Sequence, residues 1–215
     1  ISLYSAGEES IASMPNIKVG KFITQVILQN IEVEDIDLSN ATDLRSAWVQ
    51  NNPALQKLDL SYSTIWGQGD KETEGNGTYG SSLMVLGCPI LKEIKLPEKN
   101  ELKAYRIDIE CLDALETFDM SNVKMVAELS IGDLNKDFNL VYPELTIFYS
   151  EDGYAGTYFA CSENTFYRES TQAFLKANYT DIDPDDTVRR LGYTSSLSYD
   201  KNKGCRWRTL LNKQK

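Results

Sequence analysis

The chain has 215 residues, 41% of them hydrophobic and 25% charged, an ordinary composition for a folded protein with its own core. It contains no histidine, which excludes His-activated nucleophiles, His general bases and His metal ligands. The formal net charge of −10 argues against a nucleic-acid partner, because phosphate groups are neutralised by clustered Lys and Arg.

Residues 1–21 carry no repeat, and we expect them to cap the repeats that follow, since the ends of a repeat array need polar cover. The chain begins at Ile1 rather than Met, so we expect a processed N-terminus, with any signal peptide or lipid-anchor cysteine upstream. No run of 18 or more apolar residues is present, and no membrane-spanning segment is predicted.

An apolar pattern then repeats with a strict spacing of 11 residues, in units that begin at Phe22, Val33, Leu44 and Leu55. The first and sixth positions are hydrophobic, and alternation between positions four and six predicts a short strand with one buried face. The ninth position is often small and polar, as in Asn52, and such a side chain can bond backbone groups of the bend and of the neighbouring coil. A coil of two such units cannot bury its own apolar edge, so we predict a stacked solenoid.

The segment 66–82 interrupts the repeat with five glycines and several charges, and we predict a loop that is either functional or disordered. The Asn76-Gly77 step within it is typical of a tight turn. The repeat resumes with units at Leu91, Leu102, Leu115 and Val126. Two extra residues lie between the second and third of these units, near Asp108–Cys111.

Three segments share an "L-D-L-S" core: Ile36-Asp37-Leu38-Ser39, Leu58-Asp59-Leu60-Ser61 and Phe118-Asp119-Met120-Ser121. Asn51-Asn52 followed by Leu55 matches the "N-N-x-x-L" continuation of bacterial leucine-rich repeats. Residues 22–150 therefore resemble the short repeats of secreted and surface proteins of gut bacteria, relatives of the internalin-like group. The resemblance implies a fold that is α/β by family convention and strand-rich, a right-handed β/α superhelix, in an extracellular or cell-surface protein.

Residues 151–215 are expected to form a small α+β capping module. We predict a helix over 165–178 with Thr165 as N-cap, a second helix over 183–192, and a hairpin formed by 193–199 and 205–211. The cluster Asp181, Asp183, Asp185 and Asp186 suits either a helix cap or a calcium loop. Cys161 and Cys205 are candidates for a disulfide. The basic residues among the last fifteen are either solvated or contact an acidic partner or a membrane surface.

We expect a non-catalytic binding module that presents one strand face to a protein or glycan ligand, with no cofactor and no metal. The candidate ligand-binding residues point outward from the units at 44 and 102: Ser46, Trp48, Gln50, Arg106 and Asp108. The pair of Trp48 and Arg106 has the chemistry of an interface anchor, and the alternative is that Trp48 packs under the 66–82 loop or the C-terminal module. The alternatives are a carboxylate-dependent glycan hydrolase and a structural spacer. The oligomeric state is left open.

Overall fold

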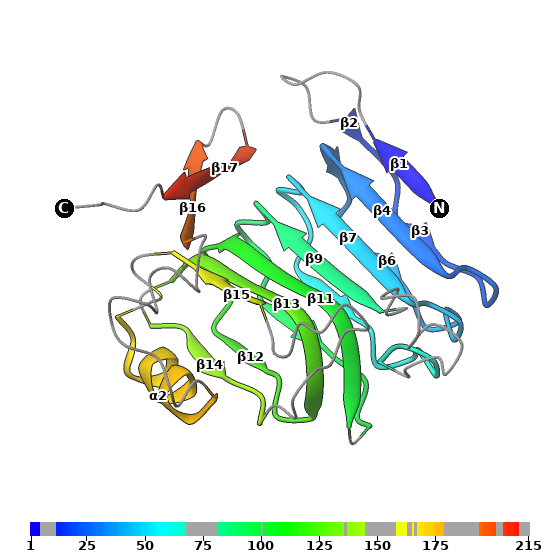
Figure 1. Cartoon of the computed structure of the whole chain (residues 1–215). Coiled ribbons are helices and arrows are strands. Elements are labelled where there is room, and N and C mark those ends of the chain that lie inside the picture. The colour runs from blue at the N-terminus through cyan, green and yellow to red at the C-terminus, as the bar shows by residue number, and fades with distance from the viewer. Residues whose placement is uncertain are drawn as a thin grey trace.

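The computed structural model describes residues 1–4, 12–67, 81–99, 101–135, 137–144, 158–162, 165, 167–178, 194–200 and 204–210. Within them the chain forms a parallel β-solenoid of about five turns (Figure 1). One side is a seven-stranded parallel sheet, here called the long-strand sheet. Its strands, in spatial order, are β1 (Ser2–Tyr4), β4 (Gln25–Gln29), β7 (Ser46–Gln50), β9 (Ser82–Leu86), β11 (Leu102–Leu112), β13 (Val123–Leu134) and β15 (Tyr158–Cys161).

The opposite side of the solenoid consists of short strands in parallel pairs, here called the short-strand side. The pairs are β2 (Ala12–Ser13) with β5 (Ile31–Glu32), β3 (Ile17–Lys18) with β6 (Ile36–Asp37), β8 (Lys57–Asp59) with β10 (Glu93–Lys95), and β12 (Thr117–Asp119) with β14 (Asn139–Val141).

Each 11-residue unit is half a turn of the solenoid. Units that begin at Phe22, Leu44 and Leu102 supply strands of the long-strand sheet, and those at Val33, Leu55 and Leu91 supply short strands. The predicted solenoid is therefore confirmed. The expected alternation of strand and helix is not seen, because the return half of each described coil is a strand of two or three residues. Eleven residues that must also form two bends leave too little chain for a helix of several turns.

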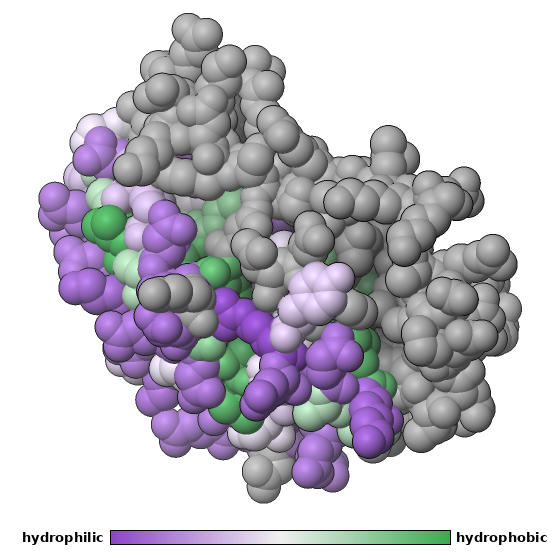
Figure 2. All heavy atoms as spheres, turned by 90° about the vertical axis from the view of Figure 1, so that its left-hand side faces the viewer, coloured by the Kyte–Doolittle hydropathy of each residue, from purple (hydrophilic) through white to green (hydrophobic). Residues whose placement is uncertain are grey.

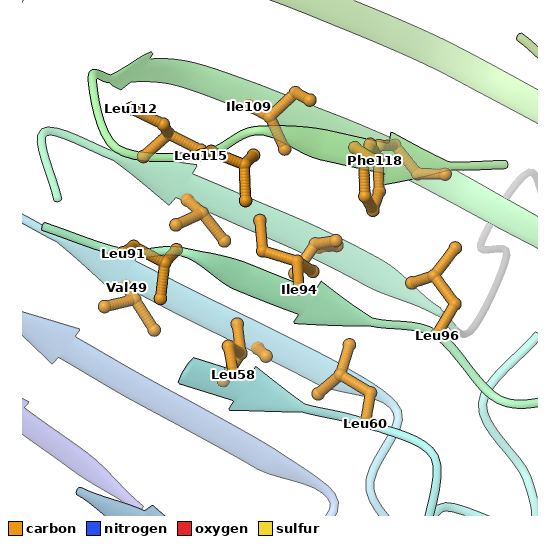
Figure 3. Close-up of a cluster of buried hydrophobic side chains, with 14 of the residues drawn as sticks. Val49, Leu58, Leu60, Leu91, Ile94, Leu96, Ile109, Leu112, Leu115 and Phe118 are labelled. Carbon is orange, nitrogen blue, oxygen red and sulfur yellow. The ribbon is translucent and has the colours of Figure 1, made fainter. Parts of the chain in front are cut away.

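The core lies between the two sides, where the apolar repeat positions meet. Figure 3 shows Leu58, Leu60 and Ile94 of the short-strand side pointing towards the long-strand sheet, which contributes Val49 and Ile109. All five side chains are buried. Burial of this kind is worth on the order of 25 cal/mol for each Å² of apolar surface, so the apolar repeat positions hold the two sides of the solenoid together.

One first position departs from the pattern: the side chain of Phe22 is 82% exposed, whereas Leu44 and Leu55 are buried. Its ring lies beside the ammonium group of Lys21, with 5.8 Å between Nζ and the ring centroid.

The polar ninth positions bond the backbone as the repeat predicts. Oδ1 of Asn52 accepts hydrogen bonds from the amides of Ala54 and Leu55 in its own bend, and from the amide of Val33 in the preceding coil. The hydroxyl of Ser63 donates to the carbonyl of Leu44 at 2.6 Å. These bonds satisfy buried backbone groups that the bends leave without a strand partner.

The 66–82 segment departs from the predicted loop at both of its ends. Trp66 is fully buried in the core, and Ser82 opens strand β9. The two ends meet, because the Gly67 amide donates to the hydroxyl of Ser81 at 2.8 Å. Residues 68–80, with the predicted Asn76-Gly77 turn, lie outside the described part.

The C-terminal end of the solenoid is covered by α2 (Glu169–Asn178). Tyr142 stacks on Phe174 with 4.4 Å between ring centroids, and its hydroxyl lies 2.9 Å from that of Thr171. Arg168 donates to the backbone carbonyls of Phe138 and Asn135. Figure 2 views the molecule from this side, where the coloured surface is mostly hydrophilic with smaller hydrophobic patches between.

The predicted helix over 165–178 is present but shorter, because it begins at Glu169 and not after an N-cap at Thr165. Thr165 is instead buried, and its hydroxyl accepts a hydrogen bond from Ser162. The predicted hairpin is confirmed as β16 (Thr194–Asp200) paired antiparallel with β17 (Gly204–Leu210). The second predicted helix and the aspartate cluster at 181–186 lie outside the described residues.

The cysteines do not follow the expected pairing. Cys161 is a buried free thiol, so the prediction of a Cys161–Cys205 disulfide is wrong. Cys88 is also free and buried, whereas Cys111 is disulfide-bonded. Burial raises the pKa of both free thiols to about 12, which makes them poor nucleophiles.

Candidate functional site

The outer surface of the long-strand sheet carries three rows of side chains, each with one residue from each of the five strands β4, β7, β9, β11 and β13. The first row is Gln25, Ser46, Ser82, Arg106 and Glu128. The second row is Ile27, Trp48, Met84, Asp108 and Ser130. The third row is Gln29, Gln50, Leu86, Glu110 and Gly132.

All five candidate residues from the sequence lie in these rows, but they form two groups rather than one. Ser46, Trp48 and Gln50 are on β7, whereas Arg106 and Asp108 are on β11. Strand β9 lies between them, so the two groups are about 10 Å apart at the usual strand spacing. Trp48 therefore has Met84, and not Arg106, as its neighbour in the adjacent strand.

The part of this surface over β4, β7 and β9 carries no charged residue, and we call it the uncharged face. Its outward residues are Gln25, Ile27, Gln29, Ser46, Trp48, Gln50, Ser82, Met84 and Leu86. The amide of Gln29 donates from Nε2 to Oε1 of Gln50 at 3.1 Å. Amide, hydroxyl and apolar groups are thus the chemistry that this face presents.

Trp48 is the large aromatic residue of the uncharged face. It is half-buried, and Ile27 and Met84, its neighbours in the second row, are half-buried as well. Its indole Nε1 is buried and donates no hydrogen bond within the part of the chain that the structure describes. A buried N–H donor without a partner is uncommon, so Trp48 has an unused hydrogen-bonding group beside its ring. The alternative expectation, that Trp48 packs beneath the 66–82 loop, involves residues 68–80, which lie outside the described part of the chain.

The surface over β11 and β13 is charged and internally paired. Arg106 donates from Nη2 to Oδ2 of Asp108 at 2.8 Å, and its Nη1 lies 3.7 Å from Oε2 of Glu128. The hydroxyl of Tyr105 donates to Oε1 of Glu128 at 3.0 Å. This hydrogen bond to the carboxylate raises the pKa of Tyr105. Asp108 faces outward as the alternation predicts, yet its side chain is fully buried.

A second buried acid, which the sequence analysis did not single out, lies beside Asp108. Glu110 is fully buried, and its Oε1 accepts a hydrogen bond from Ser130 at 2.5 Å. The Glu110 side chain packs against Gly132, where an added Cβ would lie 3.4 Å from it. Burial raises the pKa of Asp108, while hydrogen bonding to Glu110 and the nearby Arg106 act in the opposite direction.

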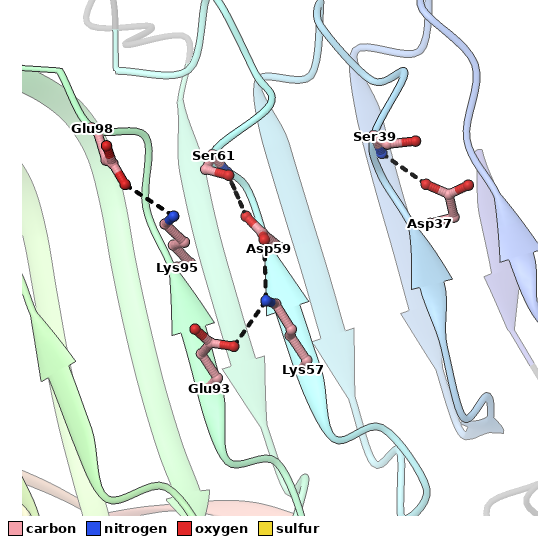
Figure 4. A network of polar contacts seen from close by, with 8 residues as sticks. All are labelled: Asp37, Ser39, Lys57, Asp59, Ser61, Glu93, Lys95 and Glu98. Carbon is pink, nitrogen blue, oxygen red and sulfur yellow. Dashed lines mark hydrogen bonds and ion pairs between the residues drawn. The ribbon is translucent and has the colours of Figure 1, made fainter.

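The outer surface of the short-strand side differs from the uncharged face. Figure 4 shows Lys57 between Glu93 and Asp59, at 3.0 and 3.3 Å, and Lys95 beside Glu98 at 2.9 Å. Solvent screens these exposed ion pairs, so they contribute little to stability. Their charges already have partners within the fold, so this surface is a weaker candidate for a ligand site.

The motif "L-D-L-S" has a local structural role at the end of the short strands. Oδ1 of Asp37 accepts a hydrogen bond from the amide of Ser39, as Asp59 does from Ser61 and Asp119 from Ser121. The aspartate thereby closes an Asx turn that takes the chain out of the strand. These aspartates are explained by the turns that they form.

No group of three or more potential metal ligands occurs within the described ranges. The same residues include no helix long and apolar enough to cross a membrane. Comparison of the chain with protein-family models, with curated proteins and with solved structures finds no match.

Proposed function

We propose that this protein is a non-catalytic binding module of the leucine-rich-repeat type, and that its uncharged face takes a neutral glycan chain. The main support for this proposal is that the outward positions of β4, β7 and β9 hold no charged residue, although the formal net charge of the chain is −10. A charged ligand would find no opposite charge on this face to offset its desolvation.

The groups on the uncharged face suit a sugar chain. The half-buried ring of Trp48 offers a flat apolar surface, and aromatic side chains of this kind supply much of the apolar contact in binding sites. The amides of Gln29 and Gln50 both donate and accept hydrogen bonds, as sugar hydroxyls require. The parallel strands repeat these groups across several coils, which favours an extended ligand.

Two further observations support the assignment to an exported leucine-rich-repeat protein. The Asx turns of Asp37, Asp59 and Asp119 give the "L-D-L-S" motif a role in a short-repeat solenoid. A disulfide at Cys111 suits an oxidising compartment outside the cytosol.

The hydrolase alternative has weaker support. Glycosidases place two carboxyl groups about 5–5.5 or 6.5–9.5 Å apart. Asp108 and Glu110, the buried acids of the long-strand sheet, instead accept hydrogen bonds from Arg106 and Ser130 within the fold. Both side chains are fully buried, so neither carboxyl group is presented to a glycan at the surface.

The proposal is tested by calorimetric titration of the whole chain with neutral oligosaccharides, such as glucan and mannan fragments, and with an acidic one such as oligogalacturonate. We expect binding of a neutral chain that weakens at least about tenfold, or about 1.4 kcal/mol, in Trp48→Ala. Lys95→Ala, on the opposite surface, is the matched control and should bind normally. Binding of the acidic chain alone, or of a protein ligand with no effect of Trp48→Ala, would reject this proposal.

A further inference from the structure

The outer surface of the long-strand sheet is more deeply buried at β11 than at β7. On β7 the outward residues Trp48 and Gln50 are half-buried. In the third row, Leu86 on β9 and Glu110 on β11 leave the sheet on the same side, yet both are buried. Full burial of outward side chains indicates that another segment of the chain lies over this end of the sheet.

Cys111 belongs to this covered surface. It is buried together with Leu86 in a small cluster apart from the main core, and Met84 packs against the two. Leu86 and Met84 are outward residues of β9, so Cys111 lies on the outer side of the sheet and not between the two sides of the solenoid. Its sulfur is disulfide-bonded, and the bond therefore starts from the outer surface.

The sequence leaves one partner for this bond within the chain. There are four cysteines, and Cys88 and Cys161 are free thiols, so the remaining one is Cys205. Cys205 lies on β17, which pairs with β16. Strand β16 in turn lies against β11, β13 and β15, and Figure 1 shows the hairpin next to these strands.

The register of the hairpin agrees with a role as a cover. Cys205 lies opposite Tyr199, and Trp207 lies opposite Leu197. Residues that are opposite each other, or two apart along a strand, share a face, so these four residues belong to one face of the hairpin. That face is apolar in sequence, as a face turned towards a buried apolar cluster should be.

We infer that Cys111 and Cys205 form the disulfide, and that this bond fastens the hairpin over the outer surface of the sheet at β9 and β11. A two-stranded hairpin is marginally stable alone in water, so packing and a covalent link together account for its place in the fold. The cover borders the proposed glycan site on β4, β7 and β9, and it does not depend on glycan binding.

The link is also sensitive to redox conditions. When the S–S bond forms, the two thiols lose two protons and two electrons to a disulfide-bonded oxidant, which leaves as two thiols. A dithiol reverses the exchange, because it reduces the bond and is itself oxidised to a disulfide. The hairpin should therefore cover the sheet firmly only while the bond is intact.

The pairing is tested by trypsin digestion of the whole chain without reductant, after alkylation of free thiols in denaturant. Cleavage at Lys and Arg gives peptide 107–124, which contains Cys111, and peptide 204–206, which contains Cys205. We expect mass spectrometry to find these two peptides cross-linked, and the cross-linked mass to disappear on reduction. Alkylated Cys111, or Cys111 linked to any other cysteine, would overturn the inference.

The cover is tested in Cys205→Ala, which removes the bond and keeps the rest of the hairpin. We expect carbodiimide and an amine to label the Glu110 carboxyl group at least about tenfold faster than in the wild type, because local opening of the hairpin then exposes it. Cys161→Ala, which changes a buried free thiol, is the matched control and should react as the wild type does.

Equal labelling of Glu110 in Cys205→Ala and in the wild type would show that the hairpin is not held over β11 by this bond. If Cys205→Ala does not fold, the wild type treated with a dithiol provides the same comparison. Faster labelling after reduction supports the cover, and an unchanged rate refutes it.

Discussion

Asn51 donates from Nδ2 to Oδ1 of Asn30 at 2.7 Å, and the two residues occupy the same place in successive coils. Both have positive φ, 53° and 54°. The next two coils repeat the conformation at Gly87 and Cys111, with φ of 63° and 54°. Each follows the third-row residue of its strand, so the chain leaves β4, β7 and β9 through one left-handed residue, and Cys111 repeats the conformation at the same place near the end of β11.

This corner predicts a specific sensitivity at Asn51. Asn51→Gly should keep the fold with little loss, because glycine adopts positive φ without steric strain. Asn51→Val should destabilise the protein by about 1–3 kcal/mol, since a β-branched residue is strained there. Urea unfolding measures both. Lys57→Val, within a strand, is the control, and an equal effect of Asn51→Val and Lys57→Val would contradict the account.

A comparison of Gly67 with Gly20 tests how tightly the chain packs at the start of the 66–82 insertion. A Cβ on Gly67, whose φ is +73°, would lie 2.6 Å from Cδ2 of Leu102, whereas a Cβ on Gly20 meets nothing within 4 Å. We expect Gly67→Ala to lose at least about 1 kcal/mol of unfolding free energy and Gly20→Ala to lose little. Thermal unfolding of the two variants decides it. Similar melting temperatures would show that Leu102 moves freely.

The cysteines should differ in their reaction with an alkylating reagent. Without reductant, Cys111 should remain unmodified even in denaturant, because it is disulfide-bonded. Cys88 and Cys161 should react in denaturant but slowly in the folded state, since burial raises their pKa to about 12. Mass spectrometry of the peptides reads both results. Modification of Cys111 before reduction would refute the disulfide.

The Asx turns predict a separate acid-side effect. Hydrogen bonds from Ser39, followed by the contact with Lys18, lower the pKa of Asp37 to about 2. Its contribution to stability should be full above the ordinary carboxyl value and lost as the pH falls towards 2. Asp37→Asn retains the accepting oxygen but not the charge, so it should weaken the acid dependence between pH 4 and 2. An unchanged acid limb in that variant would show that Asp37 does not contribute.

The sequence predicts which repeat residues point into the core, because only two periods are needed: two residues within a strand and 11 residues between units. Alternation within a strand places Val49 inward and Trp48 outward, and the 11-residue spacing stacks each unit on the corresponding unit of the next coil. The hydrogen bonds of the Asn at the ninth position are equally predictable, because an amide side chain in a bend has few partners other than backbone groups. Asn52 shows this by accepting from the amides of Leu55 and Val33.

Other features depend on contacts that no local pattern contains. Strand β9 was not predicted, because the insertion before it breaks the 11-residue spacing. Its Leu83 and Val85 nevertheless alternate with Ser82 and Met84, as in a strand. We expected Trp48 to lie near Arg106 because β9, which separates their strands, was not predicted. The burial of Asp108 depends on neighbours from β11 and β13, and alternation predicts only the direction in which a side chain leaves the sheet.

The central claim is that a neutral glycan binds beside Trp48, and the indole N–H of that residue reports on it directly. The chain has three tryptophans, and Trp48→Phe assigns its resonance in a proton–nitrogen spectrum. Titration with the neutral oligosaccharide that binds most tightly should shift the Trp48 signal and leave that of the buried Trp66 unchanged. If the ligand binds without moving the Trp48 resonance, the uncharged face is not the site.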